Sequence, residues 1–302
     1  MTQFVTLNCS AIADCLRQSA GGVHKAGESR WQFVLGDGVA TQATARFIDD
    51  FLLFDVPTTA CEFAQAPQWL RWNAALAGYA KIALVTNPWR LRLRAEIPVE
   101  EGANLASRVA ATLAGLRDAC RLLEGSQPFG KLSYEKHGLS SNDNASQPHN
   151  LFTLLHETGW VFCERSDGAA AVELAMRGRS CRVLLEQSAT RLRAAMEFLR
   201  VTDLTPPSTL AVAGLLLSAS GALRLARPYA DQTGGQFICG FEVRFAGETT
   251  ASELDRALEA LAVAAWTCEE EVQSLLDNSV AEAYLAIRNL PTLFAREEFC
   301  HG

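Results

Sequence analysis

Hydrophobic residues recur along the first part of the chain with two different spacings, and the order of these spacings predicts its secondary structure. Spacings of three and four residues, as between Leu105 and Leu123, predict amphipathic helices. Alternation of apolar and polar residues predicts strands with one buried face. The predicted order is a helix over 10–20, strands over 30–36, 40–48 and 51–57, a helix over 67–79, strands over 80–86 and 89–97, and a helix over 105–123.

The same order of helices and strands returns in the second part of the chain. It comprises a helix over 150–159, strand-like runs over 160–166, 170–178, 180–188 and 190–201, a helix over 208–219, strands over 221–229 and 235–245, and a long helix that begins at Thr250. Thr250 and Glu253 have the spacing of a capping box. This half has either a fourth strand before its middle helix or a break within its third strand, and its tail after Asn278 has no counterpart in the first half.

A polar segment between Glu124 and Asn150 separates the two halves. It is rich in Ser, Asn, Gly and Pro and shows no hydrophobic periodicity, which is typical of a linker. We therefore predict a first domain over 1–125, a linker over 126–148 and a second domain with an extra tail over 149–302. The predicted fold class is α+β, with two related domains, each an antiparallel sheet covered by helices in the order α-βββ-α-ββ-α.

Composition narrows the function classes. The chain of 302 residues is 49% hydrophobic and 20% charged, which is typical of a globular protein. Its net charge of −7 argues against a general nucleic-acid binder, which needs a surplus of cations. The chain has no targeting segment and no apolar run long enough to span a bilayer, so we expect a cytoplasmic protein with no membrane contact.

The order of elements resembles that of the type III secretion chaperone-like fold, which the bacterial YbjN-type family also shares. Here that order occurs as two copies on one chain. The resemblance implies a non-enzymatic protein that binds an extended segment of a partner protein on its sheet and helix surface. It also implies either a monomer with pseudo-dimeric halves or a homodimer. Because it rests on element order and includes no diagnostic motif, it supplies no functional residue.

One predicted strand carries an arginine at every second position. The three residues are Arg90, Arg92 and Arg94, and they alternate with Trp89, Leu91 and Leu93. Alternate side chains of a strand point to opposite faces, so we expect the apolar three to face the core. Our main interpretation of the arginines is a solvated face, near acidic residues such as Asp49, Asp50 and Asp55. The alternative is a surface that binds an acidic partner or an anion.

The first middle helix carries a second candidate for partner binding. Trp69 and Trp72 lie three residues apart and share one helical face. We interpret this face mainly as core, and as a candidate for the seam if the two halves pack like a dimer. Tyr284, Ile287 and Phe294 in the tail form another apolar group that could fold back or bind a partner.

Sequence motifs for catalysis, metals or cofactors are missing. Nine cysteines occur without a C-x-x-C pair and mostly among apolar neighbours, which is typical of reduced, buried thiols. His156 and Cys163 could meet as a catalytic pair, but their spacing carries little weight. No phosphate loop, nucleophile elbow or zinc-ligand spacing is present. We therefore predict no catalytic residue, no metal and no cofactor.

The sequence thus favours a non-enzymatic protein-binding module with a protein partner and no nucleic acid. The residues that we expect to contact the partner are Trp69, Trp72, Arg90, Arg92 and Arg94. Two alternatives remain open. One is a small-ligand-binding protein with a cavity between a sheet and its long helix, and the other is an enzyme with an unrecognised site.

Overall fold

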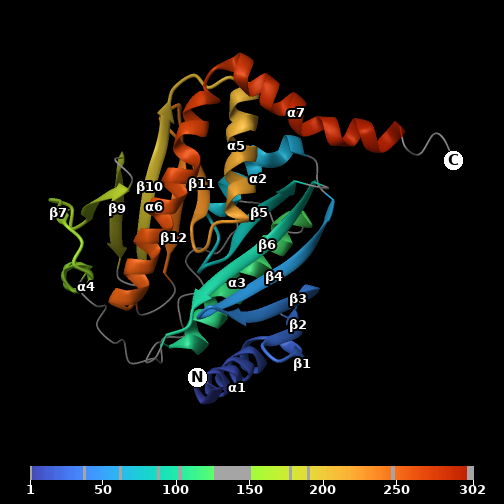
Figure 1. Ribbon diagram of the computed structural model, residues 1–302, viewed down its shortest axis with the longest axis vertical. Helices are drawn as coiled ribbons and strands as arrows, with labels where there is room; N and C mark the ends of the chain where they lie inside the picture. The colour runs from blue at the N-terminus through green and yellow to red at the C-terminus, as the bar shows by residue number, and fades with distance from the viewer. Residues whose placement is uncertain are drawn as a thin grey trace.

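The structure is a computed structural model in which two related halves pack side by side (Figure 1). It describes residues 2–36, 39–60, 63–86, 89–100, 104–125, 151–176, 179–188, 191–245 and 249–297. The predicted linker over 126–148 therefore lies outside the described residues. None of the helices within these ranges is long and apolar enough to cross a membrane.

The first half forms a six-stranded antiparallel sheet in the order β1-β2-β3-β4-β6-β5. Its strands are β1 (Gly21–Gly27), β2 (Arg30–Gly36), β3 (Val39–Ile48), β4 (Phe51–Ala60), β5 (Lys81–Thr86) and β6 (Trp89–Pro98). Its helices are α1 (Thr2–Ser19), the 3-10 turn η1 (Phe63–Gln65), α2 (Ala66–Asn73) and α3 (Leu105–Leu123).

The second half forms a matching six-stranded sheet in the order β11-β12-β10-β9-β8-β7. Its strands are β7 (Phe162–Glu164), β8 (Ala170–Met176), β9 (Arg179–Ser188), β10 (Arg191–Val201), β11 (Arg227–Thr233) and β12 (Gln236–Arg244). Its helices are α4 (Leu151–Thr158), α5 (Pro206–Ser220), α6 (Ala251–Ser274) and α7 (Asn278–Glu297). The α+β class and the two related halves are thus confirmed.

Both halves carry four strands before the middle helix, so the order is α-ββββ-α-ββ-α rather than α-βββ-α-ββ-α. The additional strand in the first half is β1, in a segment for which the hydrophobic pattern predicts no strand. Three of its seven residues are glycine, and six are exposed, so it has no alternation of buried and exposed positions. Its pairing with β2 is interrupted by register shifts, as is common at sheet edges.

The predicted turn at Asp49-Asp50 is confirmed as a two-residue hairpin between β3 and β4. Ile48 pairs with Phe51 across it, and both aspartates have positive φ angles of 49° and 61°. Two successive residues with positive φ form a type I′ turn, whose backbone twist matches the twist of the two strands that it joins. Asp tolerates this left-handed conformation better than most residues do.

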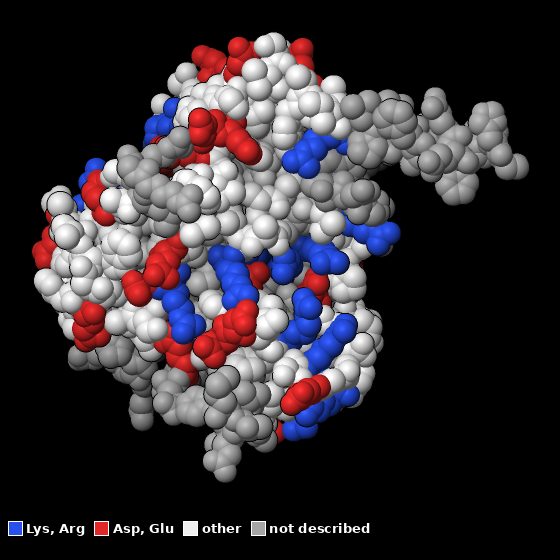
Figure 2. All heavy atoms as spheres, in the orientation of Figure 1, with Lys and Arg blue, Asp and Glu red and all other residues white. Residues whose placement is uncertain are grey.

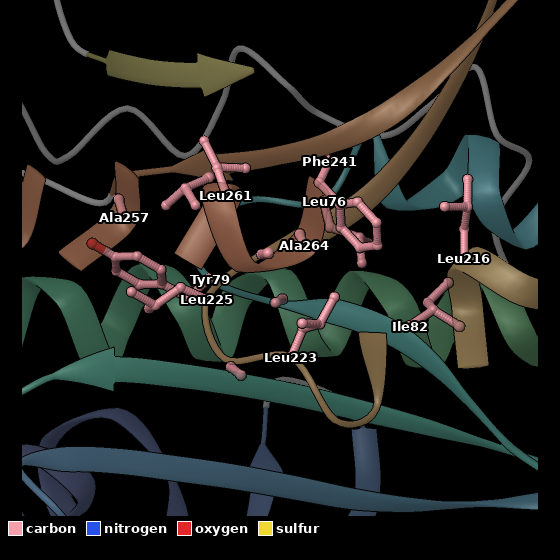
Figure 3. Close-up of a cluster of buried hydrophobic side chains, with 14 of the residues drawn as sticks. Leu76, Tyr79, Ile82, Leu216, Leu223, Leu225, Phe241, Ala257, Leu261 and Ala264 are labelled. Carbon is pink, nitrogen blue, oxygen red and sulfur yellow. The ribbon is translucent and has the colours of Figure 1, made fainter. Parts of the chain in front are cut away.

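Each sheet has an inner face covered by its own long helix, and the two inner faces belong to one continuous hydrophobic core. The helix α3 packs on β6 and on α1, while α6 packs on β10 and on α4. Figure 3 shows Leu76 and Ile82 of the first half in one cluster with Leu216, Leu223 and Phe241 of the second. The halves therefore share their core.

The two middle helices are exchanged between the halves. The helix α2 packs mainly on β11 of the second sheet, and α5 packs mainly on β5 of the first. The two helices also contact each other. Gly214 of α5 permits a close approach here, because a Cβ atom at this position would lie 2.2 Å from the ring of Phe63.

The boundary between the two halves, where β5 and β11 lie, is called the seam below. A buried cation lies at the start of each of these two edge strands. Lys81 begins β5, forms an ion pair with Glu96 of its own sheet at 2.8 Å and donates to the carbonyl of Leu223 in the other half at 2.6 Å. Arg227 begins β11, pairs with Glu242 at 2.9 Å and donates to three carbonyls of the first half. These carbonyls belong to Leu76, Gly78 and Ala80. The two contacts are equivalent, and each connects one half to the other.

We predict that replacing Arg227 with Met destabilises the protein by about 3 kcal/mol, because Glu242 loses a buried partner and three carbonyls lose their donor. Urea unfolding measures the change. The control is Arg182→Met, which removes an exposed ion pair with Glu173 and should cost less than about 1 kcal/mol. Equal losses in the two variants would contradict a special role for the seam.

Candidate functional site

The alternating arginines of β6 lie on the outer face of the first sheet, which α3 leaves open (Figure 1). Leu91 and Leu93 face the core and are buried, as the alternation predicts, whereas the side chain of Trp89 lies outside the described residues. Arg90 and Arg92 are exposed. Arg94 is partly buried and donates to the carbonyl of Gly221 in the other half.

Two more arginines from other strands join this surface. Arg30 of β2 and Arg46 of β3 are direct cross-strand partners, and both are exposed. The same cross-strand row continues through Leu53 of β4 to Glu96 of β6, which places Arg30 and Arg46 on the outer face. We define the arginine face as Arg30, Arg46, Arg90, Arg92 and Arg94. Figure 2 shows basic side chains gathered over this part of the molecule.

Most of this positive charge lacks a counter-ion. Within the described ranges, Arg30, Arg46 and Arg90 form no ion pair, and Arg92 reaches Asp55 only at 3.5 Å. Asp49, which was a candidate neighbour of these arginines, instead pairs with Arg224 of the second half at 2.9 Å. Like charges directly opposite each other in a sheet are destabilising. The Arg30–Arg46 pair therefore lowers stability in the isolated protein.

Apolar side chains adjoin the arginine face. Ile48 is 48% exposed, and Leu53 and Phe51 are partly exposed on the same face. Arg224 and Arg256 of the second half lie over the ring of Phe51, with their guanidinium carbons 5.0 and 5.6 Å from its centre. Such contacts are favourable for the ring and for the cations. The surface thus combines cationic and apolar groups and continues onto the second half.

The outer face of the second sheet has the opposite arrangement, because the arginines whose side chains are described there form ion pairs. Arg193 pairs with both Glu186 and Glu242, at 2.9 and 2.6 Å. The remaining pairs are Arg182 with Glu173, Arg200 with Glu197, and Arg244 with Glu242. Two faces with the same architecture therefore differ in charge balance.

The strand registers show where this difference arises. Lys81 pairs with Arg94 across β5 and β6, while Arg227 pairs with Glu242 across β11 and β12, so Arg94 and Glu242 occupy equivalent positions. Leu53 on β4 and Arg193 on β10 are also equivalent in the two registers. Their cross-strand partners, Arg46 and Glu186, therefore occupy equivalent positions as well. Two acidic positions of the second sheet are therefore basic in the first, while the acidic Glu96 of the first sheet is equivalent to Arg244 of the second. The net difference in charge at these positions thus comes from Arg46 and Glu186.

The two tryptophans lie at the seam between the halves. Trp69 is 1% exposed and belongs to the shared core, and Trp72 is partly buried against it. Neighbouring Arg71 donates across the seam to Gln232 of β11 at 2.8 Å. Trp69 is therefore inside the protein and not on a surface that a partner could reach.

The tail helix α7 packs on α5 with one face and extends past the body (Figure 1). Ala281 is buried and Tyr284 is partly buried against the core, while Ile287 is 64% exposed. The tail thus folds back through Tyr284 but not through Ile287. The side chain of Phe294 lies outside the described residues.

Several of the described cysteines are buried thiols. All seven described cysteines are free, and burial raises the pKa of Cys120 and Cys181 to about 11 and of Cys239 and Cys268 to about 12. These four thiols are therefore protonated at neutral pH. The ring of His156 packs edge-on against Phe162 at 5.0 Å. Among the described residues, no group of three potential ligands could hold a metal ion.

A hollow of about 310 Å³ bears on the small-ligand alternative, because it lies where β9 and β10 meet the long helix α6. Its apolar lining includes Met196 and Phe198, and its charged lining includes Arg182, Glu197 and Glu269. This mixture differs from the mostly apolar lining of a typical ligand site. No observation here favours a particular small molecule.

Another buried acid at the seam is Glu253 of α6, which is 1% exposed. Thr250 caps α6 by accepting from the Glu253 amide at 3.1 Å, as the predicted capping box requires. The Glu253 carboxylate accepts from the hydroxyl of Tyr79 and from Arg108 at 2.6 Å, both in the first half. Burial raises its pKa to about 7, although Arg108 and Tyr79 act in the opposite direction, and Glu100 adds to the increase.

No protein-family model matches the chain, and no curated protein is significantly similar to it. The surfaces described above therefore provide the evidence on function.

We predict that Glu253→Gln changes how stability depends on pH. The folded-state pKa of about 7 lies above the ordinary value of 4.5, so the stabilisation by Glu253 is complete below about pH 4.5 and is lost as the pH rises through 7. The wild-type free energy of unfolding should thus fall by roughly 3 kcal/mol relative to the variant over this range.

Urea unfolding of both proteins at a series of pH values measures this difference. A constant difference across the range would mean that Arg108 keeps Glu253 ionised throughout, contrary to the prediction.

Proposed function

We propose that the protein is a non-enzymatic binding module that takes a segment of a partner protein on the outer face of its first sheet. The observation that carries the proposal is the arginine face, where Arg30, Arg46 and Arg90 are exposed without ion pairs among the described residues. Exposed apolar groups such as Ile48 lie beside them. Arginine and exposed apolar side chains in one patch are typical of protein interfaces.

The rest of the fold supports this choice of surface. The inner faces of both sheets are buried under α3 and α6, and the edge strands β5 and β11 lie at the internal seam. The pairing surface that a homodimer would use is thus occupied within one chain, which fits a monomer with pseudo-dimeric halves. On the outer face of the first sheet, the second half covers Lys81 and Glu96, while Arg30, Arg46, Arg90 and Arg92 remain exposed and leave an excess of positive charge.

We expect a photo-reactive benzoylphenylalanine in place of Ile48 to form a cross-link with one partner protein in a lysate of the source cells, and mass spectrometry should identify the linked segment. The matched control carries the same group in place of Ala175, an exposed residue of β8 in the second sheet. Capture from position 48 but not from position 175 supports the proposal. Equal capture from both positions, or none from folded protein, contradicts it.

A further inference from the structure

We infer that the segment bound by the arginine face is acidic and extended, with carboxylates that meet arginines from different strands. This inference rests on the proposed function and adds the chemistry of the partner. It would make the first sheet, and not the second, the charged recognition surface of the molecule.

The first step is the local excess of positive charge. The protein carries a net charge of −7, yet this face holds five arginines. Its own acids are Asp55, which reaches Arg92 at 3.5 Å, and Glu96, which is buried, paired with Lys81 and 4.0 Å from Arg94. Arg30, Arg46 and Arg90 form no ion pair within the described residues. A positive patch on an acidic protein attracts acidic groups and disfavours basic ones.

The second step is the direct opposition of Arg30 and Arg46. Two cations at paired positions repel each other, and a carboxylate between them would convert this repulsion into two charge-assisted hydrogen bonds. At the position equivalent to Arg46, the second sheet places Glu186, which supplies such a carboxylate to Arg193 internally. The first sheet therefore lacks an acid that its counterpart provides.

The third step is the spacing of the cations. The cross-strand row of Arg46 reaches β6 at Glu96, two strand spacings or roughly 10 Å away. Arg94 and Arg92 lie two and four residues along β6 from Glu96, so they are roughly 12 and 16 Å from Arg46. An extended chain covers these distances in about four and five residues. A segment that crosses the strands with acids about four or five residues apart would therefore contact both groups, and its apolar residues could pack on Ile48 and Leu53.

The surroundings favour a short acidic peptide over a nucleic acid. Glu28, Asp49 and Asp50 are exposed in the hairpin turns next to Arg30 and Arg46. A long, uniformly charged phosphate backbone would pass these acids and the acidic remainder of the protein. A peptide can instead place its few carboxylates on the arginines alone.

The experiment measures the fluorescence anisotropy of a labelled peptide. In this peptide, two serine and two leucine residues separate each glutamate from the next. A glutamine version and a lysine version of this peptide are the matched probes. We expect the wild-type protein to bind the glutamate peptide, with affinity that falls as salt is added, and to bind the other two at least about tenfold more weakly. Charge reversal by Arg30→Glu with Arg46→Glu should weaken binding by at least about tenfold.

The control variant is Arg182→Glu with Arg200→Glu, which changes the net charge by the same amount but on ion-paired arginines of the second half. It should bind like the wild type. If the reversed arginine-face protein unfolds, Arg30→Gln with Arg46→Gln takes its place and should show the same direction of change.

Three results would overturn the inference: equal loss in both charge-reversed proteins, binding of the glutamine peptide as tight as that of the glutamate peptide, or tighter binding of a single-stranded oligonucleotide. The cross-link from position 48 separates this failure from that of the proposed function. A linked partner segment without acidic residues refutes the inference alone, whereas no linked partner refutes the proposed function as well.

Discussion

The architecture depends on two buried cations that cross the boundary between the halves. Lys81 and Arg227 begin equivalent edge strands, and each has a carboxylate in its own sheet and carbonyl acceptors in the other half. A buried cation is costly unless its charge and its donors are satisfied. Neither half alone satisfies them, so the two sheets are stable as a pair. The helices α2 and α5 also connect the halves, because each packs mainly on the sheet of the other half.

This internal pairing determines which surfaces remain for function. The helices cover the inner faces, and the seam covers the edges at β5 and β11, so the outer faces are the extended sheet surfaces left. On the second outer face the described arginine side chains have acidic partners, with Glu242 alone contacting Arg193, Arg227 and Arg244. On the first, Arg30, Arg46 and Arg90 have none among the described residues. A duplicated architecture thus allows one half to keep a charge-balanced surface while the other carries exposed arginines, on the surface that we propose binds a partner.

Hydrophobic periodicity predicted the fold class, the repeated plan and the inward direction of Leu91 and Leu93, because these depend on local alternation. It missed β1, whose glycines and exposed residues carry no pattern. It also missed the pairing of Arg30 with Arg46, since only the strand register brings separate segments together. Buried Lys81 and Arg227 could not be predicted either, because their environment comes from the opposite half.

The most direct test of the shared seam is native-state hydrogen exchange followed by mass spectrometry at increasing urea concentration. The account predicts that amides of β5 and β11 exchange with the same free energy and the same dependence on urea, as parts of one cooperative unit. If one sheet exchanges at a clearly lower free energy while the other keeps its protection, the halves are independent domains. That result would contradict the central role of the two buried cations.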